Sequence, residues 1–488
     1  MKPPFGGGDA PQVSVDALRS AAKDPDVRRF YEATQWQPVW SKRLEKQLGD
    51  AVHLAPKHAL LPDMFMPKTL PSDAAEREAA LTKAALSYAG ALANGRVDPA
   101  KASEVYTLPR PKTDVARGLA EALQNKKANV GAWLDSLAPQ TDEYRALSAA
   151  FLRYAQIASS AQDQDIRAGK PMKPGARDPR VGPLAEALKF NGYLPENAVI
   201  AAGAQPYAPR IVQAVKAMQQ DFGLKADGVV GPDTLQILNT GPTERARQIA
   251  VNMERRRWLA RELPPTRVDV NTAATFLEYW RDGKLRDRRN VVTGQPDWET
   301  PQLGSPMFQL VAHPTWTVPK SIEAEELATK GPAYFASQNI VRKGDKYVQM
   351  PGPKNALGAV KFDLKNDQAI YLHDTPAKAL FSANERHKSH GCIRVQDALG
   401  FARMLAQDDG VLEQFDKAFR DKPNDQSFIA LKREIPVRLM YYTVFLDPSG
   451  QLAFRTDAYG WDEDVAVALG RPQAARHKVR RQSGDIGP

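Results

Sequence analysis

The sequence predicts a multidomain α+β protein with three folded parts. Residues 14–176 show the apolar periodicity of amphipathic helices, for example in the alanine-rich run 79–88. Residues 177–241 contain three short helical segments separated by turns rich in Gly and Pro. From residue 265 to 446 the period changes to the alternation typical of strands, which predicts a mainly β domain. A chain of 488 residues is long for a single core, in agreement with several domains.

The first part is expected to be a helical domain without chemistry of its own. Residues 1–13 are rich in Gly and Pro and predict a disordered leader. Prolines at positions 56, 62, 67, 71 and 99 divide the following region into short helices. Residues 162–179 are polar and predict a linker. No motif in this region indicates a function.

The second part has the pattern of a small three-helix unit. Ile211, Val215, Met218 and Phe222 form one apolar stripe, which predicts the second helix. Asp227-Gly228 predicts a turn before a third helix that starts at Gly231-Pro232. Residues 242–264 then predict a connecting helix with Ala246 and Ile249 on its apolar face and Arg and Glu elsewhere.

The third part, residues 265–446, is predicted to be mainly β, with one helix at 396–406. A hairpin is expected over 268–283, and further strands are expected at 308–312, 359–362, 369–372, 435–446 and 452–454. Residues 319–358 interrupt the strands with a helix-like segment and a return rich in Gly and Pro. A long polar insertion beside a cleft often serves as a lid. Residues 447–488 are expected to form a C-terminal extension with a basic tail.

Charge and hydropathy exclude several classes of protein. The 67 Lys and Arg residues exceed the 57 acidic ones and give a net charge of +10. No nucleic-acid recognition motif occurs, and the cluster from Arg471 to Arg481 predicts a solvated tail with at most a weak polyanion contact. No run of about 18 apolar residues is present, so no transmembrane segment is expected. The first residues lack the apolar core of a signal peptide, which fits a cytosolic protein or a mature exported one.

The single cysteine is the most informative residue of the chain. Cys392 lies in the run Ser-His-Gly-Cys-Ile-Arg-Val, residues 389–395, and His373 precedes it by 19 positions. A thiolate is the reactive form of cysteine, and a histidine can take the thiol proton and return it to a leaving amine. Gly391 allows close approach of the backbone, so that the Gly391 and Cys392 amides could form an oxyanion hole. The alternative is a buried cysteine among structural histidines.

The wider pattern resembles the catalytic signature of L,D-transpeptidases, the YkuD-type domain. The similar runs are Ile370–Pro376, Leu380-Phe381, Arg386, Ser389–Val395, Val292–Gly294, Thr300-Pro301, Trp316–Pro319 and Pro351–Gly358. They are typical of the large multidomain Gram-negative members, whose insertion caps the active site. The run Asp227–Pro232 likewise resembles a peptidoglycan-binding domain of the three-helix type, although Met218 and the long 195–209 segment depart from that pattern. A three-helix spacer without a ligand is the alternative for this unit.

The resemblance implies a role for each candidate site residue. Cys392 would be the nucleophile and His373 the general base, and the carbonyl or the carboxylate of Asp374 would orient His373. Alternation along a strand favours the carbonyl. Gly391 would form the oxyanion hole with Cys392, and His390 would be either structural or a proton carrier. The substrate-binding candidates are Tyr371, Ser389, Arg394, Trp316 and Asn355, each with packing or local hydrogen bonding as the alternative.

The implied reaction is metal-free and cofactor-free acyl transfer on peptidoglycan. The cysteine would attack the diaminopimelate carbonyl of a tetrapeptide stem, release D-alanine and pass the acyl group to a diaminopimelate amine, which makes a 3→3 cross-link. Water or a protein amine as acceptor would instead give an L,D-carboxypeptidase or attachment of a protein to the wall. The implied partners are stem peptides and glycan, and the implied compartment is the periplasm. Less favoured alternatives are a zinc hydrolase using His373, His387 or His390, and Cys392, and a non-catalytic wall-binding protein.

Overall fold

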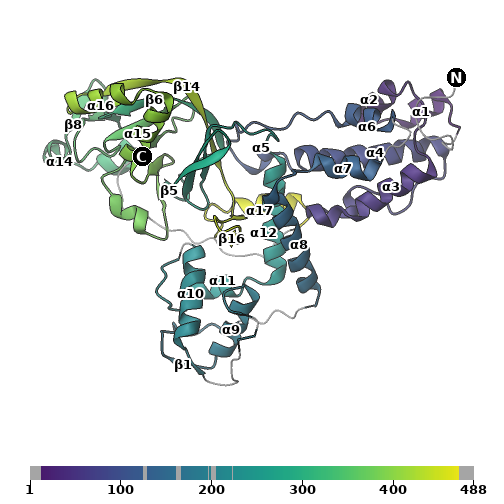
Figure 1. The fold of residues 1–488 in the computed structure, drawn as a ribbon, viewed down its shortest axis with the longest axis horizontal. Helices are drawn as coiled ribbons and strands as arrows, with labels where there is room; N and C mark the ends of the chain where they lie inside the picture. Colours follow the sequence, from purple (N-terminus) through teal and green to yellow (C-terminus); the bar gives the residue numbers. More distant parts are fainter. Residues whose placement is uncertain are drawn as a thin grey trace.

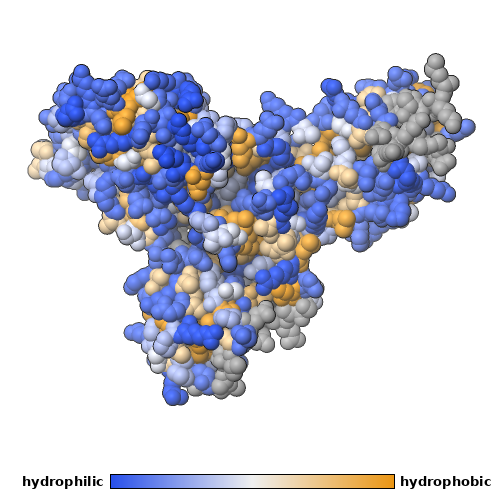
Figure 2. All heavy atoms as spheres, viewed as in Figure 1, coloured by the Kyte–Doolittle hydropathy of each residue, from blue (hydrophilic) through white to orange (hydrophobic). Residues whose placement is uncertain are grey.

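The computed structural model describes residues 12–124, 129–160, 166–195, 197–198, 205–222 and 224–471. Figure 1 shows three lobes around a junction, with the helical region to the right, the β domain to the left and the small helical unit below. The predicted multidomain α+β class is therefore confirmed. In Figure 2 hydrophilic residues cover most of this face, and hydrophobic ones are more frequent where the lobes meet. Within the described ranges, no helix combines the length and apolarity needed to cross a membrane.

The N-terminal lobe is helical, as the periodicity predicts. Its 21-residue helix α4 begins after Asp73, whose carboxylate accepts hydrogen bonds from the amides of Ala75 and Glu76, and ends at Gly95, which has φ +86°. An added Cβ at Gly95 would lie 2.6 Å from Trp258, so the close approach of α4 to the junction requires a glycine. The helices are α1 Val15–Ala21, α2 Pro25–Ala33, α3 Lys42–His53, α4 Ala74–Asn94, α5 Pro99–Ala102, α6 Val115–Gln124, α7 Val130–Leu137 and α8 Asp142–Ser160.

The small lobe contains the three expected helices, α9 Val181–Phe190, α10 Pro209–Asp221 and α11 Pro232–Leu238, and the strand pair β1 Arg177–Asp178 and β2 Gln205–Pro206. The whole predicted apolar stripe of the second helix is buried. Gln219 on α10 holds the predicted turn, because its amide group accepts from Gly228 N at 2.8 Å and donates to Val229 O at 3.0 Å. Residues 196 and 199–204 of the unusual 195–209 segment lie outside the described residues, as does the predicted leader up to residue 11.

Helix α12, Pro242–Arg257, joins the lobes. The sequence pattern places its arginines off the apolar face, yet they are buried in the structure. Each arginine has partners in another part of the chain. Arg245 lies over the rings of Phe222 and Phe454, Arg256 pairs with Glu143 at 2.7 Å, and Arg257 donates to His58 O and Tyr144 Oη at 2.8 Å. Buried charges require such compensation. The helix thus fixes the relative positions of the lobes.

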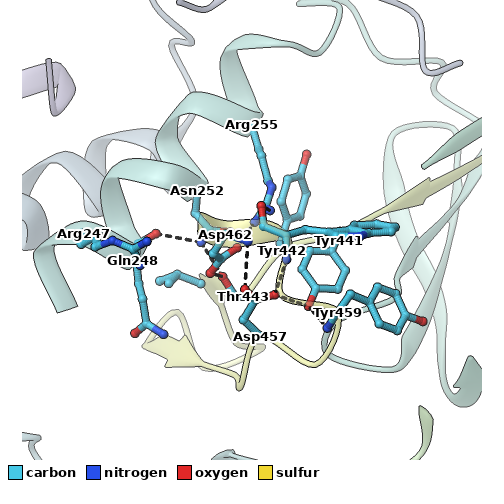
Figure 3. Close-up of polar contacts among 12 residues, drawn as sticks. Arg247, Gln248, Asn252, Arg255, Tyr441, Tyr442, Thr443, Asp457, Tyr459 and Asp462 are labelled. Carbon is cyan, nitrogen blue, oxygen red and sulfur yellow. Dashed lines mark hydrogen bonds and ion pairs between the residues drawn. The ribbon is translucent and has the colours of Figure 1, made fainter. Parts of the chain in front are cut away.

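The C-terminal extension is folded against α12 up to residue 471. It consists of a hairpin of β15 Val444–Leu446 and β16 Leu452–Phe454, followed by α17 Trp461–Ala468. In Figure 3 Asp462 pairs with Arg255 and accepts a hydrogen bond from Thr443 Oγ1, and Asn252 of α12 donates to Thr443 at 2.7 Å. The predicted basic tail lies outside the described residues, except for Arg471, which is partly buried against Phe151.

The β domain is built on one sheet of nine strands in the order β12-β5-β13-β11-β10-β6-β14-β3-β4. Because β4 also pairs with β5, the sheet closes on itself around an apolar core. Helix α15 Ala398–Asp409, at the predicted position, and α16 Leu412–Asp421 add Phe401, Leu405 and Phe415 to this core. The strands are β3 Arg267–Asn271, β4 Phe276–Arg281, β5 Lys284–Gly294, β6 Leu303–Ala312, β10 Val360–Leu364, β11 Leu372–His373, β12 His387–Ser389, β13 Ile393–Val395 and β14 Ser427–Met440.

The insertion between β6 and β10 has a small core of its own. Trp316, Ile322 and Leu327 are buried there, and Tyr371 of the β domain packs against them. Its elements are β7 Trp316–Thr317, α13 Lys320–Ile322, the π-helical turn Glu323–Leu327, α14 Pro332–Ser337, β8 Ile340–Lys343 and β9 Lys346–Gln349, with the three strands in the order β7-β9-β8. The insertion therefore sits directly beside the strand that carries His373.

Candidate active site

Three neighbouring strands place a row of three basic side chains on one face of the sheet. Lys361 of β10 is the register partner of His373 of β11, and His373 is the partner of Arg394 of β13. Residues that are directly opposite on neighbouring strands point to the same face. All three belong to the β domain and come from segments far apart in the sequence.

A second row on the same face contains the cysteine. β10 and β11 are antiparallel, so two residues beyond the pair of Lys361 and His373, Asp363 lies opposite Tyr371. β11 and β13 are parallel, so one residue before the pair of Leu372 and Ile393, Tyr371 lies opposite Cys392. The ring of Tyr371 lies 5.6 Å from that of His373 and 4.3 Å from Lys361 Nζ, as this arrangement requires. His373 and Cys392 are thus diagonal neighbours on one face.

The Cys392 thiol is buried and holds its proton firmly in this state. Cys392 is only 5% exposed, and this burial raises the pKa of its thiol to about 11. Hydrogen bonds from Tyr371 and the charges of Lys361 and Arg394 lower the pKa of the thiol, but they do not cancel the effect of burial. Burial, together with the neighbouring Cys392, also raises the pKa of Tyr371 well above its usual value. The thiol therefore requires a base to become a nucleophile near neutral pH.

His373 is oriented by a main-chain carbonyl. Its Nδ1 lies 2.5 Å from Asp374 O, and because a carbonyl only accepts, Nδ1 carries the proton of the neutral ring. Nε2 is then the basic nitrogen. The carboxylate of Asp374 is directed elsewhere, since it accepts from Ala359 N at 2.9 Å and pairs with Lys378. Of the two orienting groups considered for His373, the structure has the carbonyl in place.

A tight turn presents the cysteine. Ser389 Oγ donates to Cys392 O at 2.6 Å and accepts from Gly391 N at 3.2 Å. Gly391 has φ +107°, and its carbonyl accepts from Thr300 Oγ1 at 2.8 Å. Ser389 thus has the local role weighed from the sequence. In this structure the Gly391 amide, expected to contribute to the oxyanion hole, is bonded to Ser389.

His390 contacts the insertion. Its Nε2 lies 3.3 Å from Glu326 Oε1 in the π-helical turn, and its ring meets Trp298 edge to face at 4.9 Å. Glu326 was not anticipated, because sequence distance gives no sign of this contact.

Trp316 and Asn355, both expected to bind substrate, are buried in the structure. Trp316 is 3% exposed and belongs to the core of the insertion. Asn355 is 1% exposed, donates to the carbonyls of Pro314, Gln349 and Met350, and accepts from Leu357 N at 2.8 Å. Its amide group thus braces the loops at the base of the insertion.

His387, one of the histidines named for the less favoured zinc alternative, has other partners. His387 Nδ1 bonds Glu385 at 2.6 Å, and its Nε2 bonds Thr272 O at 3.0 Å. In the part of the chain that the structure describes, no three His, Cys, Asp or Glu side chains converge in the way a metal ion needs. The residues present are those of a cysteine–histidine pair supported by neighbouring cations.

Comparison with known families agrees with this geometry. Residues 265–412 match the family described as "L,D-transpeptidase catalytic domain". The chain contains an L,D-transpeptidase catalytic domain. Residues 25–160 match a scaffold domain, and residues 177–238 match a family described as "Putative peptidoglycan binding domain". The resemblance read from the motifs is thereby confirmed for both units.

One curated relative is named "Putative L,D-transpeptidase", from Haemophilus influenzae, and it is 28% identical over 222 residues. The match covers 41% of this chain and 45% of the relative. Solved L,D-transpeptidases from Stackebrandtia nassauensis and Enterococcus faecium, the latter a mutant, are 15% and 14% identical, with TM-scores of 0.23 and 0.20. The first match covers 57% of this chain and 97% of the solved chain, and the second covers 37% of this chain and 53% of the solved chain. At such scores the solved structures support no conclusion about this chain.

Proposed function

We propose that the protein is a peptidoglycan L,D-transpeptidase in which Cys392 forms a thioester with a stem peptide. The observation that carries the proposal is the placement of His373 and Cys392 on one face of neighbouring strands, inside the matched domain. The buried thiol needs a base, and the basic nitrogen of His373 is set by the carbonyl of Asp374.

The first half-reaction is attack on the diaminopimelate carbonyl of a tetrapeptide stem. A bond forms between Sγ of Cys392 and this carbon, the bond to the D-alanine nitrogen breaks, and the thiol proton passes through His373 to the leaving amine. Lys361 and Arg394 stabilise the thiolate that forms, because both cations lower the pKa of the thiol. The same two cations suit the carboxylates of the stem.

The second half-reaction transfers the acyl group to the side-chain amine of another diaminopimelate. The amine nitrogen attacks the thioester, the Cys392 thiolate leaves, and the amine proton returns to it through His373. The 3→3 cross-link is favoured over hydrolysis by the burial of the thiol, since exclusion of water protects a thioester. Hydrolysis to an L,D-carboxypeptidase product, or transfer to a protein amine, would use the same thioester.

The peptidoglycan-binding domain indicates peptidoglycan as the partner of the chain. We place the protein in the periplasm, where this polymer lies. Retention of the chain on the polymer by residues 177–238 would raise the local concentration of stems around the β domain.

The thioester is tested with a carbapenem, the inhibitor class that acylates this family. The intact mass of the protein is expected to rise by one covalent adduct, and Cys392→Ala is expected to give none. Circular dichroism checks the fold of the variant. An adduct that persists in Cys392→Ala would show that another residue is acylated.

A further inference from the structure

A second cavity, of about 560 Å³, lies where three parts of the chain meet. Its walls come from the end of α10 in the peptidoglycan-binding domain, from β5 and residues 381–387 of the catalytic domain, and from the segment around β15 and β16. Figure 1 shows α10 below the catalytic domain at this place. Cys392 is not among the lining residues, so the cavity is separate from the active site. Its volume suits a ligand of a few residues.

Three arginines line this cavity. Arg288 pairs with Glu278 at 3.1 Å, whereas Arg386 directs its donors to the carbonyls of Val291, Ala383 and Thr275. Arg455 donates to Phe454 O at 2.8 Å. Among the residues that the structure describes, neither Arg386 nor Arg455 has a carboxylate within ion-pairing distance.

Burial makes the charge of each guanidinium group unfavourable here. It lowers the pKa of each, and that of Arg455 falls to about 10; the charge of Asp221 opposes this fall, whereas the charges of Arg386 and Arg288 add to it. A buried cation without an ion pair is unfavourable, and an anion that enters the cavity would relieve this cost.

The acidic residues of the lining are already engaged. Asp221 accepts from Tyr193 Oη at 2.9 Å, and Glu385 holds the ring and the amide of His387. Asp447 accepts from the amides of its own hairpin turn. Their charges attract the arginines without forming an ion pair with Arg386 or Arg455. These two arginines can therefore still pair with an anion, while an ammonium group of the same ligand would meet a carboxylate nearby.

We propose that this cavity binds a short peptide with several carboxylates, such as the free peptide stem of peptidoglycan, through Arg386 and Arg455. The assignment of the stem rests on the proposed function and on the contribution of the peptidoglycan-binding domain to the wall of the cavity. Asn384 on this wall also donates to Leu224 O, so the cavity adjoins a direct contact between the two domains. A bound stem would tie the polymer-binding domain to the catalytic domain away from the thiol.

Calorimetric titration of the full chain with the free tripeptide L-Ala–D-Glu–diaminopimelate tests this site. All proteins carry Cys392→Ala, so that no thioester forms. Arg455→Gln is expected to weaken binding at one site by about tenfold, Arg455→Lys is expected to weaken it less, and Arg433→Gln, an exposed arginine outside the lining, is expected to leave it unchanged. The tripeptide with amidated carboxylates is expected to bind the parent as weakly as the intact peptide binds Arg455→Gln. Equal affinity of Arg455→Gln and parent, with equal unfolding temperatures, would overturn the proposal.

A second readout separates this inference from the proposed function. With Cys392 intact, Arg455→Gln is expected to form the carbapenem adduct at the parent rate, because Arg455 lies outside the active site. Adduct formation without an Arg455-dependent site would reject the cavity alone. Arg455-dependent binding without any adduct would support the cavity and reject the acyl-transfer proposal.

Discussion

His390 Nε2 and Glu326 Oε1 lie 3.3 Å apart, so a residue of the insertion contacts the motif that carries the nucleophile. The two residues are 64 positions apart in the sequence, and both side chains are largely buried. Tyr371, the register neighbour of Cys392, also packs against the core of the insertion. The insertion therefore contacts the site at two points, and we expect the contact between His390 and Glu326 to restrict access of a stem to Cys392.

Glu326→Ala is expected to accelerate adduct formation at Cys392. A contact of this kind contributes about 1 kcal/mol, so its loss raises the open population about fivefold. The measurement is the rate of the carbapenem mass shift. Glu323→Ala is the matched control, because Glu323 lies on the same turn but pairs with Lys320 within the insertion at 2.9 Å. An unchanged or slower rate in Glu326→Ala alone would show that the contact does not restrict access.

The proposed nucleophile and base could be picked out from the sequence because their chemistry is local. Cys392 is the only cysteine, and its motif carries its own glycine and histidine. Lys361 could not be predicted as a site residue, because its position beside His373 depends on which strands pair and in which register. Arg386 shows the converse, since it is close to Cys392 in sequence but lines another cavity.

The folds of the lobes could be predicted better than their junction. Apolar periods of 3.6 and 2 residues identify helices and strands, and the stripe on α10 is buried as expected. The same reasoning gave no sign that the arginines of α12 are buried, because a pattern within one helix does not reveal Asp462, Glu143 or Tyr144 on other segments. Long-range partners decide the burial of a charge.

Glu254→Ala is expected to destabilise the junction strongly. Glu254 and Arg257 are both fully buried and paired at 2.6 Å, and Glu254 also accepts from Val97 N at 2.7 Å. Removal of one partner leaves a buried charge without compensation, which costs about 3–5 kcal/mol. The measurement is the free energy of the first unfolding transition in urea. Glu121→Ala removes the exposed pair with Arg117 and is expected to leave that transition unchanged.

Glu78→Gln is expected to remove a pH dependence from the stability of the scaffold. Burial raises the pKa of Glu78 to about 7, whereas an unfolded glutamate titrates near ~4.3. The folded state therefore binds this proton more tightly, so the contribution of Glu78 to stability is complete below about pH 4 and is lost as pH rises to 7, by about 3 kcal/mol. Glutamine keeps an oxygen for the Trp40 amide, which Glu78 binds at 3.1 Å.

Urea unfolding of the scaffold at pH 5, 6, 7 and 8 measures this effect. The parent is expected to lose stability across the series, and Glu78→Gln is expected to lose less and to be the more stable protein at pH 8. Glu76→Gln, exposed on the same helix, serves as the control and is expected to follow the parent. Parallel curves for the parent and Glu78→Gln would contradict a titration of this carboxyl group.

His373→Ala is expected to slow acylation near neutral pH by about 10²–10⁴-fold, the usual contribution of a positioned base. Because burial raises the pKa of the Cys392 thiol to about 11, the fraction of thiolate without a base increases tenfold per pH unit up to that value. The rate of adduct formation in the variant should therefore climb with pH through the range 7–10 and approach that of the parent. His390→Ala is expected to lack this recovery, since His390 contacts Glu326. A larger and pH-rescued defect in His390→Ala, with circular dichroism showing both variants folded, would transfer the role of base from His373 to His390.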